Sequence, residues 1–250
     1  MLRYVIIILF VALFLVCSIP LMLVEWIIGK FNPDLKNRSS LAIVLWAFRT
    51  ALWMAGTKVI VKGEENIPRD TAVLYVGNHL SLFDIPITYV RVPRPTGYVA
   101  KLELEKIPLL RFWMTNLHCL FLDRKNIKQG LKTILTGIEK AKSGISICIF
   151  PEGTRNKNSD CVLPFHEGSF KIAEKAGVPI VPMVLVNTAS IFEDHFPKVK
   201  KATVIVEYLE PIYLDKLEKE QKKFIGAYVH DLIEERYLKL NTAQKHGREK

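Results

Sequence analysis

The first two dozen residues form the longest apolar run in the chain. Residues 4–24 are apolar except for Ser18 and Pro20, and a single helix of this length would cover roughly 32 Å, about the hydrocarbon thickness of a bilayer. A cleaved signal peptide is the alternative, because Arg3 supplies a short positive start. The apolar region is longer than a usual signal core and no A-x-A-like site follows it. We therefore expect a retained anchor, either a transmembrane or a re-entrant helix.

A second apolar segment, residues 41–55, is too short for a usual membrane span. Its length favours a helix that lies in the membrane interface. Lys30, Lys36 and Arg38 lie between the two apolar segments. They favour a cytoplasmic connection, because cytoplasmic loops of membrane proteins are enriched in lysine and arginine. Residues 1–56 are thus predicted to anchor the rest of the chain at the cytoplasmic face of a membrane.

From residue 57 onward, short strand-like runs alternate with helical patterns. Apolar residues recur with a helical period over 126–142, 167–176 and 217–240. The strand-like runs cover 57–62, 72–77, 97–100, 120–122, 145–150, 180–186 and 202–207. Such alternation indicates an α/β domain with a largely parallel sheet. We expect one catalytic domain over residues 57–250, built as a layered sheet surrounded by helices.

Charge and cysteine content narrow the class of protein. The chain is half apolar and carries a formal net charge of +10, which favours association with phospholipid headgroups or nucleic acid. The strand-like runs lack the interleaved aromatic and basic residues of a nucleic-acid surface, so a phospholipid membrane is the expected partner and nucleic acid is not. The four cysteines show no C-x-x-C spacing and Cys17 lies in the anchor, so no disulfide framework is expected.

The segment 76–84 carries the most informative pair of residues. His79 and Asp84 follow a strand-like run, with four residues between them. On a regular helix their side chains would lie about 140° apart, but they can meet if His79 lies in a loop and Asp84 begins the next helix. Asp84 would then orient one imidazole nitrogen and leave the other as a general base. The alternative is a capping box, in which Ser81 and Asp84 close the start of that helix.

Three cations, Lys101, Arg124 and Arg155, each come at or just after the end of a strand-like run. If the sheet is parallel, these ends meet at one edge, where open α/β sheets place their sites. Arginine contacts a phosphate in bidentate fashion and lysine contacts it as a point charge. The placement therefore favours a phosphate site. Each cation alone is also explained as a solvated charge or a structural ion pair, and Asp123 is a candidate partner of Arg124.

Arg155 ends the block Phe150-Pro151-Glu152-Gly153-Thr154-Arg155. Glu152 is a candidate to orient a cation or to bind a substrate hydroxyl, and the alternative is that it only holds the turn. Gly153 permits close backbone approach or a positive φ. Residues 164–170 open a helix whose N-terminus is expected to face the same cleft.

Other kinds of site are not supported. Ser81 has no G-x-S-x-G around it, and the cysteines lie in apolar contexts that blunt their reactivity. His118 and His166 lack a carboxylate at the spacing of His79 and are expected to be structural. No H-E-x-x-H or C-x-x-C pair indicates a metal, and no P-loop or G-x-G-x-x-G indicates a nucleotide. We expect no metal and no resident cofactor.

Four blocks, in order, resemble those of the membrane-bound glycerolipid acyltransferases, specifically 1-acyl-sn-glycerol-3-phosphate acyltransferase. The blocks are Asn78-His79-x-x-x-x-Asp84, Phe121-Leu122-Asp123-Arg124, Phe150-Pro151-Glu152-Gly153-Thr154-Arg155 and Val178-Pro179-Ile180-Val181-Pro182-Met183. Residues 100–104 and the paired N-terminal hydrophobic segments are also similar to that family. The match spans roughly residues 57–210, and the blocks show no departure from the family pattern.

The resemblance implies a glycerol-3-phosphate acyltransferase-like fold and a fatty acyl transfer from a thioester, acyl-CoA or acyl carrier protein (acyl-ACP), to the sn-2 hydroxyl of lysophosphatidic acid, giving phosphatidic acid. His79 would be the general base and Asp84 would stabilise the imidazolium. Lys101 and Arg155 would bind the acceptor phosphate. The further substrate-binding candidates are Arg124, Glu152, Gly153 and Thr154.

Several alternatives stay open at this stage. The acceptor can be glycerol-3-phosphate or a lysophospholipid with a larger headgroup. A thioesterase would use His79 to activate water, and a basic membrane-attached binding module would need neither His79 nor Asp84. Backbone N–H groups at the start of the helix after His79 are a hypothetical oxyanion site.

Overall fold

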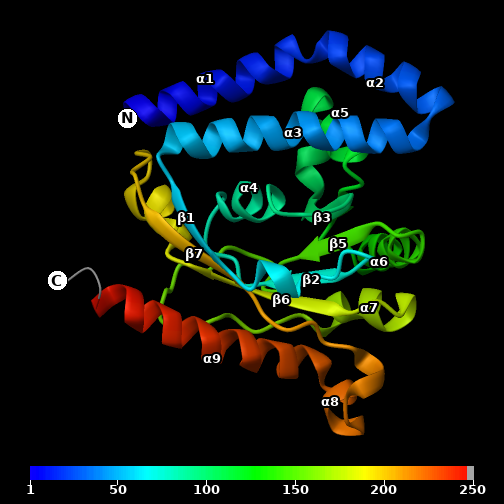
Figure 1. The fold of residues 1–250 in the computed structure, drawn as a ribbon, viewed down its shortest axis with the longest axis vertical. Coiled ribbons are helices and arrows are strands. Elements are labelled where there is room, and N and C mark those ends of the chain that lie inside the picture. The colour runs from blue at the N-terminus through cyan, green and yellow to red at the C-terminus, as the bar shows by residue number, and fades with distance from the viewer. Residues whose placement is uncertain (247–250) are drawn as a thin grey trace.

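The computed structural model describes residues 1–246. Seven strands form one sheet in the order β1-β7-β6-β2-β5-β3-β4 (Figure 1). They are β1 (Lys58–Lys62), β2 (Leu74–Gly77), β3 (Thr96–Lys101), β4 (Leu120–Leu122), β5 (Ser146–Ile149), β6 (Ile180–Val186) and β7 (Thr203–Tyr208). Each strand falls on one of the predicted runs, which confirms the α/β class.

The sheet is mostly parallel, as predicted. β2 pairs in parallel with β5 and β6, and β3 pairs in parallel with β5 and β4. β7 runs antiparallel to β6 and parallel to β1, so the two strands at that end are reversed. The carboxyl ends of β2 to β6 therefore meet at one edge of the sheet, and the loops that follow these strands lie together there.

Helices cover both faces of the sheet (Figure 1). They are α1 (Leu2–Cys17), α2 (Ile19–Phe31), α3 (Pro33–Ala55), α4 (Asp84–Tyr89), α5 (Pro108–Asn116), α6 (Ile127–Lys142), α7 (Lys171–Ala176), α8 (Lys219–Lys223) and α9 (Ile225–His246). β2 shows how two cores arise, because its side chains alternate. Tyr75 packs with residues of α3, α4 and α5, and Leu74 and Val76 pack with residues of α6, α7 and α9.

The N-terminal apolar segment forms two helices and not the single helix expected for residues 4–24. α1 ends at Cys17 and α2 begins at Ile19, with a 49° bend between them. The break lies beside Pro20, whose ring lacks the N–H that a continuous helix needs, and the Ser18 hydroxyl bonds back to a carbonyl of α1. Among the described residues no single helix is long and apolar enough to cross a bilayer, although this bent pair meets both criteria when taken together.

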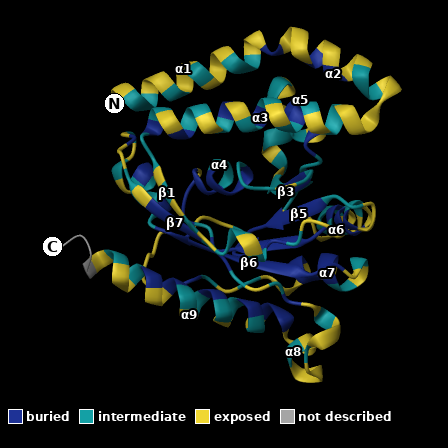
Figure 2. Ribbon diagram, viewed as in Figure 1, coloured by how far each residue is buried: buried dark blue, intermediate teal, exposed yellow. Residues whose placement is uncertain are grey.

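The second helix is longer than the predicted 41–55. α3 begins at Pro33, where the side chain of Asn32 accepts a hydrogen bond from the N–H of Leu35. Proline is well suited to the first turn of a helix, so the polar stretch before residue 41 continues the apolar helix. α3 packs against α1, α2, α4 and α5. Many of the exposed large apolar side chains lie on α1 and α2 (Figure 2).

Other helical segments also differ from the sequence prediction. The sequence predicted that a helix begins at Asp84, which is α4, but it did not predict where this helix ends. α5 was not predicted, because it is too short for a readable period. The segment 167–176 begins as a 3₁₀ helix over Glu167–Phe170 before α7. The segment 217–240 is divided between α8 and α9, with a break at Phe224, and α9 continues to His246.

Candidate active site

The segment after β2 brings His79 and Asp84 together. β2 ends at Gly77, and the chain passes through a loop before α4 begins at Asp84. The Nδ1 atom of His79 lies 2.8 Å from Oδ2 of Asp84. The two side chains therefore meet in the way that the sequence predicted, with the histidine in the loop and the carboxylate at the helix start.

Asp84 has two structural roles at once. Its side chain is fully buried, and Oδ2 also accepts hydrogen bonds from the backbone N–H groups of Leu80 (2.7 Å) and Ser81 (2.8 Å). Because this oxygen acts as an acceptor for its neighbours, Nδ1 of His79 is the protonated nitrogen and Nε2 carries the lone pair. Only half of the predicted capping box is present, because the Ser81 hydroxyl accepts from the N–H of Phe83 and not from that of Asp84. The same carboxylate also orients the imidazole.

The turn after β5 holds His79 from two further sides. The imidazole stacks on Phe150, with ring centroids 4.5 Å apart and planes 16° from parallel. The backbone N–H of His79 donates to Oε1 of Glu152 (2.8 Å), and its carbonyl accepts from the N–H of Asn156 (2.7 Å). Glu152 therefore supports the loop that carries His79.

Glu152 is an unusual carboxyl group. It is 5% exposed, and its burial raises the pKa to about 8, with the negative charge of Asp84 adding to the rise and the N–H of His79 opposing it. Its Oε2 atom is buried without a hydrogen-bond partner among the described residues. At neutral pH the side chain is therefore mostly protonated, and it places no second full negative charge beside Asp84.

Gly153 allows the tight turn between Glu152 and Arg155. Its φ of +69° lies in the left-handed region, which favours glycine. A Cβ at this position would lie 3.2 Å from two atoms of the His166 ring. The turn leaves Thr154 and Arg155 exposed at the edge of the site.

A cavity of about 980 Å³ opens at the carboxyl edge of the sheet. The predicted site residues all line it, apart from the buried Asp84; they are His79, Lys101, Arg124, Glu152, Gly153, Thr154 and Arg155. The rest of its wall includes apolar side chains from α3, α4, α5 and α6, among them Phe48, Ile85, Leu110, Met114 and Ile134. An imidazole, three cations and an apolar wall in one space suit an amphiphile with an anionic headgroup.

The three cations have different local partners. Nζ of Lys101 lies 3.6 Å from Oε1 of Glu103. Partial burial lowers the pKa of the Arg124 guanidinium, and Glu103 opposes this shift. Nη1 of Arg155 lies 2.8 Å from Oε1 of Glu193. Each cation thus faces the same cavity, and two of them are held by a carboxylate.

Asp123 does not pair with Arg124 in the described part of the chain. Its Oδ1 accepts instead from the backbone N–H of Lys125 (2.9 Å). Asp123 therefore closes a local turn, and the sequence alternative of a structural Asp123–Arg124 pair is not realised.

Few backbone N–H groups before α4 remain for the hypothetical oxyanion site. The backbone N–H groups of residues 80–84 all donate to acceptors within the protein. A hydrogen-bond donor must be free of other acceptors to stabilise a developing oxyanion. Closing the loop around Asp84 has used these donors.

The two other histidines considered from the sequence differ in their placement. Nε2 of His118 lies 3.0 Å from Oδ1 of Asn37 on α3, and burial lowers its pKa to about 4, with Lys140 adding to the shift. These contacts fit the structural role expected for it. His166 lines the cavity against Gly153, and the segment that contains it reaches the cleft as predicted. Among residues 1–246 no His, Cys, Asp and Glu side chains cluster in a way suited to a metal.

Two residues of the site were not identified from the sequence. The sequence analysis included Phe150 only as the first residue of the block 150–155. A phenylalanine at that position does not by itself indicate that its ring stacks on His79. Glu193 lies 112 positions after Ser81, and the residues around it show no helical or strand periodicity. Only contacts made across the fold reveal it.

Comparison with known proteins identifies the family of this chain. Residues 58–186 match the family model described as Acyltransferase. The chain belongs to the acyltransferase family. Over 196 residues it is 32% identical to the 1-acyl-sn-glycerol-3-phosphate acyltransferase of Borreliella burgdorferi, with 78% of each chain covered. Over 214 residues it is 34% identical to the enzyme of the same name from Haemophilus influenzae, covering 82% of this chain and 85% of that relative.

A solved structure supports the same family. The chain is similar to the crystal structure of the 1-acyl-sn-glycerophosphate (LPA) acyltransferase PlsC from Thermotoga maritima, with a TM-score of 0.79, 25% identity and 95% of each chain covered. The family resemblance seen in the four sequence blocks is therefore confirmed.

Proposed function

We infer that this protein is a 1-acylglycerol-3-phosphate O-acyltransferase of phospholipid biosynthesis. It transfers a fatty acyl group from a thioester to the sn-2 hydroxyl of lysophosphatidic acid and forms phosphatidic acid. The relatives named for this reaction cover most of the chain. The observation that carries the inference is the His79–Asp84 pair at a cavity that also holds three cations and an apolar wall.

His79 acts as the general base. Because its Nδ1–H donates to Asp84, Nε2 accepts the proton of the sn-2 hydroxyl as the oxygen attacks the thioester carbonyl. The C–S bond then breaks, the acyl group remains on the acceptor oxygen, and the proton on Nε2 passes to the departing sulfur. Asp84 stabilises the imidazolium between these two transfers. The thioester is already activated, so no covalent enzyme intermediate is needed.

The cations of the cavity bind the acceptor. Lys101 and Arg155 contact the phosphate, and Arg124 adds a third positive charge on the same wall. Glu152, Gly153 and Thr154 form the turn that places Arg155 at the edge of the cavity. The apolar side chains from α3 to α6 accommodate the acyl chains.

The N-terminal segment 1–56 serves as the membrane anchor of a catalytic domain that begins at residue 57. Exposed apolar side chains on α1 and α2 supply the contact with lipid. The Trp113 indole N–H donates to the Ser18 hydroxyl (2.9 Å), which ties the bend to α5, and α3 packs along both helices. These ties favour insertion into one leaflet, with the catalytic domain at the cytoplasmic face, where both acyl-CoA and acyl-ACP are available as donors.

The test is an assay of the purified, detergent-solubilised protein with radiolabelled lysophosphatidic acid and either acyl-CoA or acyl-ACP. We expect labelled phosphatidic acid from the wild type. His79→Ala should lower the rate by ~10²–10⁴-fold, the usual contribution of general base catalysis. Release of free fatty acid without phosphatidic acid would instead identify a thioesterase.

His230→Ala is a matched control for the histidine substitution. His230 forms a second His–Asp pair, with Nδ1 3.0 Å from Oδ1 of Asp231 on α9, and it does not line the cavity. This variant should turn over at the wild-type rate. Wild-type turnover by His79→Ala would remove His79 from the reaction.

A further inference from the structure

Glu193 makes three hydrogen bonds with a single carboxylate. It follows β6 through a short 3₁₀ turn, Thr188–Ile191, and begins another 3₁₀ turn, Glu193–His195. Its Oε1 accepts from Nη1 of Arg155 (2.8 Å) and from the backbone N–H of Leu82 (2.8 Å). Its Oε2 accepts from the hydroxyl of Ser81 (2.5 Å). One side chain thus joins the loop after β2 to the turn after β5.

The loop that Glu193 holds is the one that orients the catalytic pair. Ser81, which is fully buried, donates its backbone N–H to Oδ2 of Asp84 (2.8 Å), the atom that also accepts from His79. The Ser81 hydroxyl in turn accepts from the N–H of Phe83 (3.0 Å). A shift of Ser81 would therefore disturb the hydrogen bonds of Asp84, which contacts the imidazole directly.

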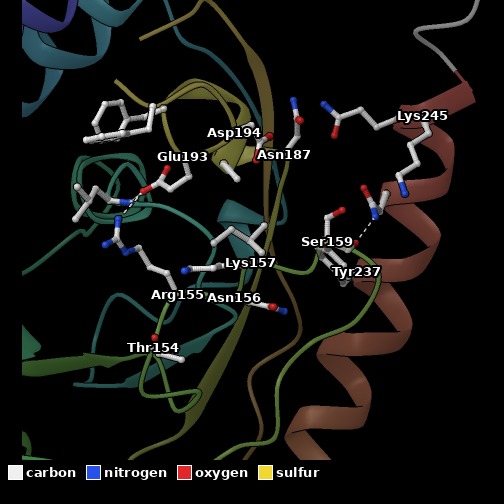
Figure 3. A pocket seen from close by; sticks show the side chains of 17 residues that line it. Thr154, Arg155, Asn156, Lys157, Ser159, Asn187, Glu193, Asp194, Tyr237 and Lys245 are labelled. Carbon is white, nitrogen blue, oxygen red and sulfur yellow. Dashed lines mark hydrogen bonds and ion pairs between the residues drawn. The ribbon is translucent and has the colours of Figure 1, made fainter. Parts of the chain in front are cut away.

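Glu193 itself lies outside the catalytic cavity. It lines a second cavity of about 810 Å³ on the far side of Arg155. The two cavities share Leu82, Thr154 and Arg155 as a common wall. Figure 3 shows Arg155 and Glu193 turned toward one another at the edge of this second cavity, away from α9. Glu193 thus reaches the reaction only through the residues it holds.

We propose that Glu193 is a positioning residue, which holds Arg155 and the 81–82 loop in the arrangement that receives the acceptor phosphate beside His79. The proposal rests on the proposed function, because it assigns Arg155 to the phosphate. Within the guanidinium of Arg155, only Nη1 donates to Glu193. The other N–H groups of the guanidinium can therefore donate to a ligand. A long side chain held in one place before binding loses less conformational freedom when the ligand arrives.

A negative charge next to Arg155 also repels the substrate phosphate, so the two effects oppose each other. Arg155 is 43% exposed and Glu193 21% exposed, and solvent weakens charge interactions at such positions. The hydroxyl of Ser81, by contrast, is buried and would lose its acceptor. We therefore expect the positioning effect to exceed the repulsion.

Glu193→Gln and Glu193→Ala distinguish the contact of Glu193 with Arg155 from its contacts with the 81–82 loop. A glutamine keeps a carbonyl oxygen for the N–H of Leu82 and donates to the Ser81 hydroxyl, but it loses the charge that holds Arg155. It should raise KM for lysophosphatidic acid by roughly tenfold, the value of one charge-assisted hydrogen bond, with kcat within about threefold of wild type. Glu193→Ala also frees the loop and should lower kcat by about 10–100-fold.

Asp194→Asn is the matched control. Asp194 adjoins Glu193 and lines the same second cavity, and the substitution removes the same charge without any of the three hydrogen bonds. Its kinetics should equal those of the wild type. A second comparison makes Glu193→Gln in an Arg155→Ala background, where it should change KM no further, because its effect acts through Arg155.

A lowered or unchanged KM in Glu193→Gln would overturn the proposal. So would a tenfold rise in KM when Glu193→Gln is added to the Arg155→Ala variant. An effect on thermal stability alone, with kcat and KM unchanged, would also overturn it by showing a purely structural role. Failure of the wild type to acylate lysophosphatidic acid would be a different result, because it refutes the proposed function and not the role of Glu193.

Discussion

Replacing Asp84 by asparagine separates the charge of this side chain from its hydrogen bonds. Oδ2 accepts from His79, Leu80 and Ser81, whereas Oδ1 is buried and has no partner among the described residues. An asparagine with its carbonyl oxygen in the place of Oδ2 keeps all three acceptor contacts. The tautomer of His79 and the closure of the loop are then retained, and the negative charge is lost.

The size of the effect follows from the charge that His79 acquires during the reaction. Two unit charges about 4 Å apart interact by about 4 kcal/mol at the effective dielectric of a protein site. That energy corresponds to roughly 10³-fold in rate. We expect Asp84→Asn to lower kcat by about 10²–10³-fold. KM for both substrates should change little, because Asp84 does not line the cavity.

The measurement is kcat for phosphatidic acid formation under saturating donor and acceptor, made on protein whose thermal unfolding has been recorded. The asparagine puts an amide in the buried place of Oδ1, which costs about 1–3 kcal/mol of stability if no acceptor is found, so the assay temperature must lie below the unfolding transition. Asp231→Asn, the same change in the His–Asp pair of α9, controls for the substitution. A kcat within threefold of wild type in Asp84→Asn would refute an imidazolium that depends on this carboxylate.

Two further predictions concern Arg155 and Glu152. Arg155→Ala should raise KM for lysophosphatidic acid by at least tenfold, as expected for loss of a charged contact to phosphate, and an unchanged KM would remove Arg155 from the phosphate site. Burial raises the pKa of Glu152 from about 4.5 to about 8 in the folded protein. Between these two pH values the folded state binds a proton that the unfolded chain has lost. The free energy of unfolding therefore falls as pH rises from 4.5 toward 8. Glu152→Gln removes this titration while keeping an acceptor for the N–H of His79. The free energy of unfolding of the variant should therefore rise relative to wild type between pH 5 and pH 8, by at most about 1.4 kcal/mol per pH unit. Thermal unfolding of both proteins across this range measures the difference, and a constant difference would contradict the protonated state.

Local patterns along the chain were sufficient to predict the layered fold and the contact between His79 and Asp84. Alternation of apolar side chains marks a strand that separates two cores, and β2 shows this in Leu74, Tyr75 and Val76. The convergence of Lys101, Arg124 and Arg155 on one cavity could also be predicted, because parallel strands bring their carboxyl ends to one edge. These inferences need only neighbours in sequence and the general geometry of a parallel sheet.

The N-terminal segment shows where local patterns give less information. Hydropathy measures how apolar a stretch is, and residues 4–24 therefore looked like one continuous helix. The helix breaks beside Pro20, and the Ser18 hydroxyl at the bend also accepts a hydrogen bond from Trp113, 95 positions later. α3 likewise extends beyond its apolar part, because its polar first turns are capped by Asn32 and packed against α2.

The sequence by itself determined the α/β class, the two faces of the sheet, the His79–Asp84 pair and the cations at its carboxyl edge, since each is written in residues close together or in strands of known direction. Only the tertiary structure decided that the N–H groups after His79 are already bonded, that burial protonates Glu152 and that Glu193 holds Arg155. Hydrogen-bond satisfaction and burial depend on which distant segments meet, and a carboxylate that bridges two loops leaves no periodic trace in the chain.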